Sequence, residues 1–185
     1  MGTNPMQAKG LIAADDIPIF YEMKLKLSNI PKERILKLEG SDWLYAILAH
    51  RKSCNMFNNL QIARFWRNKL ANYDIIFGKI ADDRMSEAIE RYSAFGLTDK
   101  GLKACLETIN YGIQYVAKTQ FACQQIEIVS QHKLCEEELN EAVRYSNKRR
   151  EEGQEIVNRM VYRYVGNGEY LKSLIEREKV KERER

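Results

Sequence analysis

The stretch YDIIFGKIADDRM, residues 73–85, decides the fold of this chain. Its apolar, β-branched run from Tyr73 to Phe77 predicts a buried strand. Beyond the strand, apolar residues recur at helical spacing, at Met85, Ala88, Ile89 and Tyr92. The stretch therefore predicts a strand that leads directly into an amphipathic helix.

Gly78 and Lys79 stand at the end of this strand, where a glycine followed by a lysine could form a phosphate-binding loop. The P-loop requires G-x-x-x-x-G-K-[ST], in which several glycines expose backbone N–H groups to phosphate. Here the chain offers one glycine and no hydroxyl after the lysine. Asp82 and Asp83 could act on a metal or a proton, but adjacent aspartates at a helix start usually cap the helix and complement its dipole. We interpret both pairs, and Asp74 before them, as structural.

The same spacing rules predict further elements along the chain. Alternating residues from Ile17 to Leu27 predict a half-exposed strand, and QQIEIV at 124–129 predicts another. Residues 113–123 fit either a strand or a helix. Helices are expected after Ser41, over 62–72, after Asp82 or Asp83 up to Gly96, and after Thr98. The strands that we expect to form one small mixed or antiparallel sheet are 17–28, 33–39, 73–80 and 124–129.

A long helix is predicted from Glu136 onward. Its expected inner face consists of Leu139, Val143, Ser146, Arg150, Gly153, Val157, Met160 and Tyr164. The fold class is therefore α+β: a small mixed or antiparallel sheet with packed helices and a long helical C-terminal arm. We divide the chain into an N-terminal arm (1–16), an α+β domain (17–135) and a helical C-terminal extension (136–185).

The composition argues against several classes of protein. With 185 residues, 44% of them hydrophobic and 30% charged, the chain can bury a sizeable core in one domain. No apolar run approaches the roughly 20 residues that cross a bilayer, and the start MGTNPMQAKG does not read as a signal peptide. The four cysteines and two histidines show no metal-ligand spacing. We expect reduced thiols, no metal, no membrane contact and a cytoplasmic location.

The net charge of +4 belongs to the front half of the chain. Residues 17–80 hold 11 Lys/Arg against 5 Asp/Glu, an excess of six, whereas residues 136–185 hold 12 of each. Such an excess attracts a polyanion or an acidic protein face. Because +4 is modest for a dedicated nucleic-acid binder, we expect only weak, non-specific and salt-sensitive association with free nucleic acid.

Basic and aromatic residues alternate in one segment and form a candidate partner-binding patch: Arg51, Lys52, Phe57, Arg64, Trp66, Arg67 and Lys69. This mixture suits phosphate contact with base stacking. It also suits an acidic protein partner, or a helix whose aromatic side chains simply pack inward, and the sequence leaves all three open. A second basic stretch is surrounded by glutamates, which favours a solvated, salt-bridged helix face; it consists of Arg144, Lys148, Arg149 and Arg150.

Several segments resemble an uncharacterised bacterial domain family with an ADP-ribosyltransferase-like fold. They are YDIIFGKIADDRMSEAIERY (73–92), QQIEIVSQ (124–131), SDWLYAILAHRK (41–52) and IPIFYEMKLKL (17–27), and the resemblance covers about residues 17–135. Transferases of this fold hold NAD with an early His or Arg strand and a second segment that carries Tyr or Ser. The sixteen residues before the first matching strand contain no His, Arg or Tyr. The resemblance therefore implies a scaffold without the N-terminal catalytic half.

One element of a transferase site does have a candidate. Gln125 and Glu127 lie two residues apart on a predicted strand, so their side chains would share a face, and they resemble the Q-x-E of some transferases. A carboxylate without the groups that orient nicotinamide has little to act on. We therefore expect no enzyme activity and no cofactor; the alternative is a mono-ADP-ribosyltransferase, a toxin or a phage-encoded modifier, that uses NAD and Glu127.

The leading hypothesis is a non-enzymatic interaction or inhibitor protein with a protein or ribonucleoprotein partner. Phage and mobile-element inhibitors of host defence reuse old scaffolds in this way. Within that class, an anti-CRISPR protein that binds a Cas9–guide RNA complex is the most specific form of the hypothesis. The binding half of a toxin–antitoxin pair is a further alternative.

Overall fold

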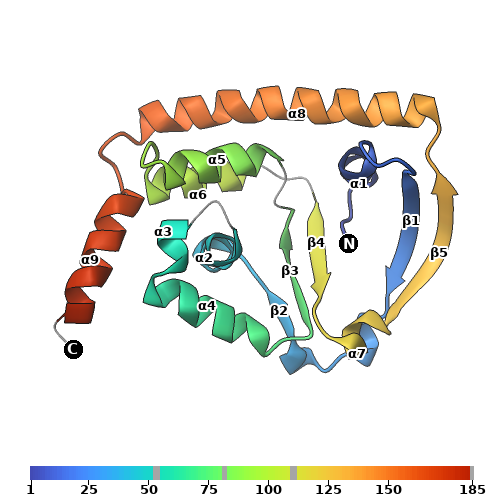
Figure 1. Cartoon of the computed structure of the whole chain (residues 1–185), viewed down its shortest axis with the longest axis horizontal. Helices are drawn as coiled ribbons and strands as arrows, with labels where there is room; N and C mark the ends of the chain where they lie inside the picture. Colours follow the sequence, from blue (N-terminus) through green and yellow to red (C-terminus); the bar gives the residue numbers. More distant parts are fainter. Residues whose placement is uncertain (52–54, 81–82, 109–111, 184–185) are drawn as a thin grey trace.

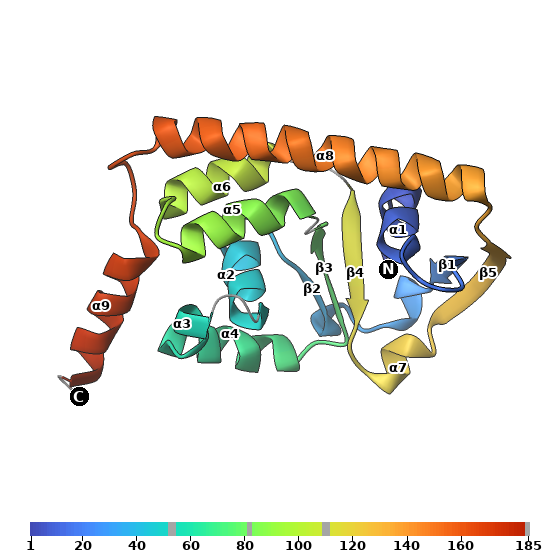
Figure 2. The ribbon, with the colours of Figure 1, turned by 45° about the horizontal axis from the view of Figure 1, so that its top comes forward.

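The computed structural model describes residues 1–51, 55–80, 83–108 and 112–183. A three-stranded sheet and the helices around it form a body, and a two-stranded ribbon stands beside that body (Figure 1). The long helix α8 (Glu136–Arg163) runs past both of them in two views (Figure 1, Figure 2). The other elements are α1 (Pro5–Ile12), β1 (Ile19–Leu25), η1 (Leu27–Asn29), η2 (Lys32–Arg34), β2 (Ile35–Lys37), α2 (Gly40–His50), α3 (Asn55–Asn58), α4 (Gln61–Ala71), β3 (Ile75–Lys79), α5 (Asp83–Ser93), α6 (Asp99–Thr108), β4 (Ile113–Ala117), α7 (Gln120–Cys123), β5 (Ile126–Lys133) and α9 (Leu171–Arg183). The predicted fold class is confirmed.

Strand β3 lies at the centre of the three-stranded sheet, parallel to β2 and antiparallel to β4. Ile75 packs into a small cluster with Ile30 and Ala122 on one face, while Ile76 belongs to the main core under the helices. Because alternate side chains of a strand point to opposite faces, β3 is buried on both sides. Burial on both sides explains the continuous apolar run, and it confirms the buried strand predicted there.

Gly78 marks a close approach between helix α2 and strand β3. A Cβ at this position would stand 2.6 Å from Cδ1 of Trp43 and 3.0 Å from the carbonyl oxygen of Leu38. The indole Nε1 of Trp43 also donates to the carbonyl oxygen of Lys79 at 3.1 Å. The Gly-Lys pair therefore serves helix-to-strand packing, which agrees with its structural interpretation.

The strands form two sheets, and the prediction of a single sheet is wrong. β1 pairs antiparallel with β5, and neither strand joins the β2–β3–β4 sheet. The outer edge of β4 is taken by the first residues of the chain: Tyr115 N donates to Met1 O at 2.8 Å, and Thr3 N donates to Ile113 O at 2.9 Å. Alternation identifies a strand but does not name its hydrogen-bonding partner, so the sequence could not separate the two sheets.

The first sixteen residues, expected to be an arm, contain helix α1. Asn4 caps this helix, since its Oδ1 accepts a hydrogen bond from Gln7 N at 3.2 Å. Gly10 lets α1 approach α8 closely, because a Cβ there would collide with Oγ of Ser146. So short a helix owes its stability to tertiary packing rather than to its own sequence. Residues 1–16 carry no periodic pattern in the sequence, so this helix could not be predicted from it.

Helix α8 confirms the long helix predicted from Glu136, with a partial shift of its inner face. Ala142, Gly153 and Val157 are buried, whereas Val143 and Arg150, predicted to lie inside, are exposed. The predicted positions follow a strict seven-residue repeat, but a straight α-helix drifts by about 20° per heptad. The prediction therefore holds in the second half of the helix and is wrong by one residue in the first half.

The predicted boundaries of the middle helices are right in part. Thr98 caps α6 as predicted, and its Oγ1 accepts from Gly101 N at 3.1 Å. The left-handed residue after α5 is Phe95, with φ 64°, rather than the expected Gly96. The ambiguous residues 113–123 contain both a strand and a helix, namely β4 and α7.

Two further capping predictions concern helix starts. α2 begins at Gly40, with Glu39 as its N-cap, rather than after Ser41. Asp82, one of the two residues predicted to cap α5, lies outside the described residues, as does Lys52 of the basic patch. Asp83, the other candidate, is the first residue of α5.

Three absences concern only the part of the chain that the structure describes. No helix there is both long and apolar enough to cross a bilayer. No cluster of three His, Cys, Asp or Glu side chains there could hold a metal ion. Cys105, Cys123 and Cys135 form no disulfide there, and burial raises the pKa of the Cys105 thiol to about 12.

Candidate functional site

The ribbon of β1 and β5 exposes large apolar side chains along one face. Ile19, Tyr21 and Met23 follow one another at every second position of β1, so they share a face. Ile128 on β5 lies opposite Met23 and extends the same face. The exposed fractions of these four side chains are 37%, 40%, 40% and 58% in the order named. We call this set, Ile19, Tyr21, Met23 and Ile128, the ribbon stripe.

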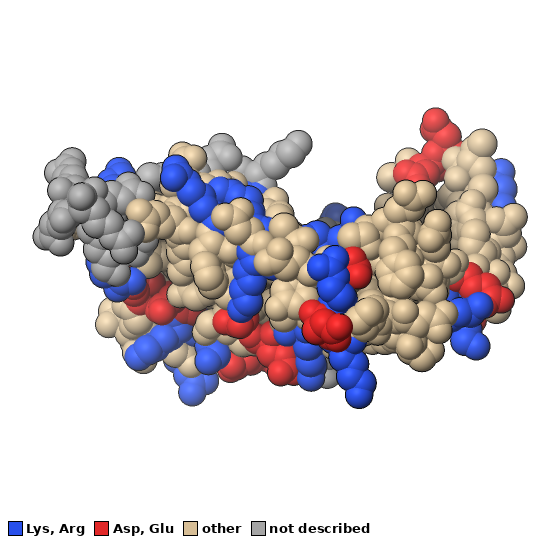
Figure 3. All heavy atoms as spheres, turned by 90° about the horizontal axis from the view of Figure 1, so that it is seen from below, with Lys and Arg blue, Asp and Glu red and all other residues tan. Residues whose placement is uncertain are grey.

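The opposite face of β1 is partly covered. The ring of Phe20 lies 5.7 Å from that of His132 on β5, and the ammonium of Lys9 on α1 lies 5.5 Å from the Phe20 ring centre. Seen from below, the charged side chains gather at the left and centre of the molecule, while the right-hand part is mostly uncharged (Figure 3). The ribbon thus combines one supported face with one face on which the exposed apolar ribbon stripe lies beside Gln131 and Lys133 of β5.

Glu138 fastens the ribbon to α1 and α8. Its carboxylate accepts from Lys9 Nζ at 2.7 Å, contacts His132 Nε2 at 3.2 Å and accepts from Cys135 N at 3.1 Å. These contacts, led by the hydrogen bond from Lys9, lower the pKa of Glu138 to about 2. Glu138 is therefore ionised at neutral pH and ties three elements together at the end of the ribbon.

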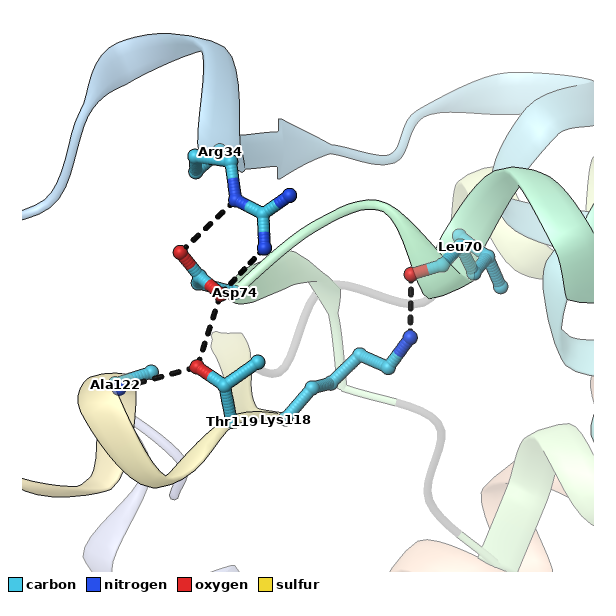
Figure 4. A network of polar contacts seen from close by, with 6 residues as sticks. All are labelled: Arg34, Leu70, Asp74, Lys118, Thr119 and Ala122. Atoms are coloured by element: carbon cyan, nitrogen blue, oxygen red, sulfur yellow. Dashed lines mark hydrogen bonds and ion pairs between the residues drawn. The ribbon is translucent and has the colours of Figure 1, made fainter.

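Asp74, directly before β3, links the start of β2 to the start of α7 (Figure 4). Arg34 donates to both carboxylate oxygens of Asp74, at 3.1 and 2.9 Å, and Thr119 Oγ1 donates to it at 2.9 Å. Thr119 in turn accepts from Ala122 N at 3.2 Å and so caps α7. The hydrogen bond from Arg34 is the main cause that lowers the pKa of Asp74. A buried carboxylate so fully partnered serves structure, as predicted for Asp74.

The predicted basic and aromatic patch is not one surface. Phe57 and Trp66 are buried in the main core. Arg67 donates to the carbonyl oxygens of Ala49 and Asn58, at 3.3 and 2.7 Å. The aromatic part of the patch thus packs inward, which is one of the three interpretations left open by the sequence.

The remaining patch residues lie at or near the surface. Arg51 donates to Oγ of Ser86 at 2.8 Å and so links α2 to α5. Arg64 is exposed. Lys69 lies over the Trp66 ring, 4.3 Å from its centre. The structure therefore keeps these charges at or near the surface, where the neighbouring Phe65 is the exposed aromatic side chain, at 58%.

The second basic stretch lies along α8. Arg144, Lys148 and Arg150 are exposed, while Arg149 is half-buried with its guanidinium 4.9 Å from the ring centre of Tyr145. Acidic side chains of the same helix surround them in sequence. This placement agrees with the solvated helix face that the charge pattern predicts.

Gln125 and Glu127 do not share a strand face. Gln125 lies in the turn before β5, where it accepts from Asn29 Nδ2 at 2.8 Å. Glu127 lies on β5 and pairs with Lys26 Nζ at 3.0 Å, a contact that lowers the pKa of Glu127. The predicted strand began two residues too early, because a polar turn and a polar strand edge look alike in sequence. Both side chains are engaged in contacts that hold the ribbon.

Sequence reasoning missed the ribbon stripe. The alternation from Ile17 to Leu27 was visible, but an apolar face on a strand normally predicts burial. The sequence of β5 does indicate exposure of this face, because Ser130, Gln131 and His132 offer no matching apolar face. A strand paired with so polar a partner has few apolar neighbours to cover it.

The fold and the ribbon stripe define a class: an α+β domain with an open two-stranded ribbon and a long crossing helix. Residues 7–128 match a protein family described as a protein of unknown function, DUF3990. The match covers more than half of the chain, so the chain belongs to this family. No curated protein and no solved structure matches the chain.

Proposed function

We propose that this protein is a non-enzymatic binding protein whose ribbon stripe contacts a protein or ribonucleoprotein partner. The observation that carries the proposal is the apolar face of Ile19, Tyr21, Met23 and Ile128, which stays open on a ribbon of only two strands. Isolated two-stranded ribbons are at best marginally stable in water, and contiguous exposed apolar groups mark interaction sites. A partner that covers the stripe would stabilise both the ribbon and the complex.

Charge favours an anionic partner. Residues 17–80, which include β1, carry an excess of six positive charges. Such an excess steers a protein toward acidic protein faces and nucleic-acid backbones. A Cas9–guide RNA complex, which offers both kinds of surface, is the most specific partner that we propose, and the protein would then act as an anti-CRISPR inhibitor.

The engagement of Gln125 and Glu127 favours binding over NAD chemistry. Glu127 is paired with Lys26, and Gln125 is held by Asn29. A catalytic carboxylate must reach the reacting atoms with its geometry preorganised. We expect that labelled NAD and a bacterial extract leave no protein labelled. Labelling that disappears in the Glu127→Gln variant would replace the binding proposal with the transferase alternative.

The stripe itself is tested by Met23→Glu combined with Ile128→Glu. Both residues are about half exposed, so the fold should survive, while two carboxylates would be desolvated by any partner that covers them. The matched control is Tyr162→Glu, an exposed site on α8 that lies outside the stripe. We expect the double variant to lose binding to a purified Cas9–guide RNA complex by about a hundredfold or more, with the control unchanged.

Two results would contradict parts of the proposal. If neither the parent nor the control binds the Cas9–guide RNA complex, that partner is wrong, and a pull-down from lysate with the same variants tests the stripe alone. If the double variant captures the same partners as the parent at full affinity, the stripe is ordinary surface.

A further inference from the structure

A cavity of about 350 Å³ opens between helix α2 and the sheet, away from the ribbon stripe. Helix α2 contributes Trp43, Ile47 and His50, which lie on one side of the helix at steps of four and three residues. The sheet contributes Ile76 of β3 and Val116 of β4, which lie opposite each other in register. The cavity therefore has two apolar walls that come from rigid elements.

The polar groups of the cavity are basic or neutral. His50, Lys79, Gln114 and Lys118 line it, and no carboxylate does so among the described residues. Lys118 is oriented by a hydrogen bond from its Nζ to the carbonyl oxygen of Leu70 near the end of α4 (Figure 4). An ammonium has three donors, so Nζ retains capacity for a ligand. The charge of the lining thus fits an anion.

The lining also decides what kind of anion fits. Pockets for small molecules are mostly apolar, with a few polar groups that fix orientation. Here the apolar walls dominate. Gln114 and Lys118 lie on either side of Val116 along the chain, and of the two lining lysines it is Lys118 whose charge acts on His50, so one ammonium and one imidazole lie at the same end of the cavity. A single carboxylate on an apolar body matches one oriented ammonium and one imidazole.

We propose that this cavity binds a small amphipathic carboxylate, a fatty or aryl monocarboxylic acid. The apolar body lies between Trp43, Ile76 and Val116, and the carboxylate is held by Lys118 and His50. This inference is independent of the proposed binding function, because it concerns another face of the molecule and another class of ligand.

The charge state of His50 gives the site a pH dependence. Burial is the first cause that lowers the pKa of His50, followed by the positive charges of Lys118, directly after β4, and of Arg67 on α4. Lys79 of β3 and Gln114 of β4 also face the cavity. The free site therefore holds a neutral imidazole at neutral pH. A bound carboxylate raises the pKa of His50, so binding strengthens as the pH falls through the range in which histidine titrates.

Decanoate is the probe, and Trp43 is the reporter. The chain has two tryptophans, so a Trp66→Phe background leaves Trp43 in the cavity wall as the only tryptophan, which is excited selectively over tyrosine at long wavelength. We expect decanoate, below its micelle concentration, to change the Trp43 emission saturably, and decanol to bind about tenfold more weakly. Calorimetry on the parent protein checks the same affinity without the background substitution.

Matched variants test whether the probe occupies this cavity. Val116→Glu places a carboxylate in the wall at a side chain that is 46% exposed, and Ile128→Glu places one in the ribbon stripe. We expect Val116→Glu and Lys118→Met each to weaken decanoate binding by about tenfold or more, with Ile128→Glu unchanged. In His50→Gln, the gain in affinity between pH about 8 and about 6 should vanish.

Each contrary result overturns the proposal. No saturable heat or emission change with decanoate would exclude the site. Equal loss in Val116→Glu and Ile128→Glu would show non-specific association with exposed apolar surface. Equal affinity for decanol and decanoate would show that Lys118 and His50 do not recognise the carboxylate.

Discussion

The body and the ribbon use the same residue types in opposite ways. In the body, Ile89 of α5 is 0% exposed and packs in the main core, whereas Ile128 of β5 in the ribbon is 58% exposed. The body is held by apolar burial between helices and sheet. The ribbon is held at its end by the contacts of Glu138 with Lys9 and His132.

This difference teaches that a side chain's chemistry does not settle its burial. Apolar residues are buried when a second element covers them, and two strands alone offer no such cover. The apolar residues of the body are therefore covered, while those of the ribbon stripe remain exposed. A surface of that kind is suited to a partner, which is why the proposed function rests on the ribbon.

The largest expected effect is the difference in stability between truncations of Ile89 and of Ile128. Ile89→Ala should lower the free energy of unfolding by about 2–5 kcal/mol, because it leaves a cavity in a closely packed core. Ile128→Ala should lower it by less than about 0.5 kcal/mol, because its side chain is already largely in water. Urea unfolding of both variants measures the contrast. Equal losses would mean that the ribbon stripe is covered in solution and that the comparison is wrong.

A second, smaller effect tests how closely helix α2 packs on strand β3. Gly78→Ala brings a methyl group against Trp43 and should cost about 1–3 kcal/mol of stability through overpacking. The cost should shrink in the Trp43→Phe background, where the smaller ring leaves room, and a double-mutant cycle measures this coupling. Full stability of Gly78→Ala in the parent background would show that helix α2 does not rest on β3 as closely as described.

The smallest effect, and one that disappears in acid, concerns the ribbon. Glu138 has a folded-state pKa lowered from 4.5 to about 2, so its contribution to stability is present above pH 4.5 and is lost as the pH falls toward 2. Glu138→Gln should therefore be less stable than the parent at pH 7, and the two should converge near pH 2. Thermal unfolding across this range measures the difference, with Glu141→Gln, an exposed glutamate on the same helix, as the control. A constant gap between parent and variant would show that Glu138 does not act through its charge.

Local patterns were enough to predict most elements. The apolar run at 73–77, the spacing of Met85, Ala88, Ile89 and Tyr92, and Thr98 as a cap all describe neighbours in sequence, and each is confirmed. The long helix from Glu136 was equally clear. Such features depend on propensity and periodicity, which act within a few residues.

The candidate sites were predicted less well, because each depends on what covers a side chain. Phe57 and Trp66 were candidates for partner contact and are instead core residues. Gln125 and Glu127 were expected on one strand face and are instead separated by the start of β5. The ribbon stripe was not predicted, since alternation alone indicates a buried face.

The sequence by itself determined the α+β class, the central strand with its helix, the Thr98 cap and the long C-terminal helix. The tertiary structure alone decided that β1 pairs with β5 in a second sheet, that residues 1–12 pack on β4 and α8, and that one apolar face stays open. The physical reason is the range of the interactions involved. Helical and strand periodicity are local, whereas strand pairing and burial depend on contacts between residues that are far apart along the chain.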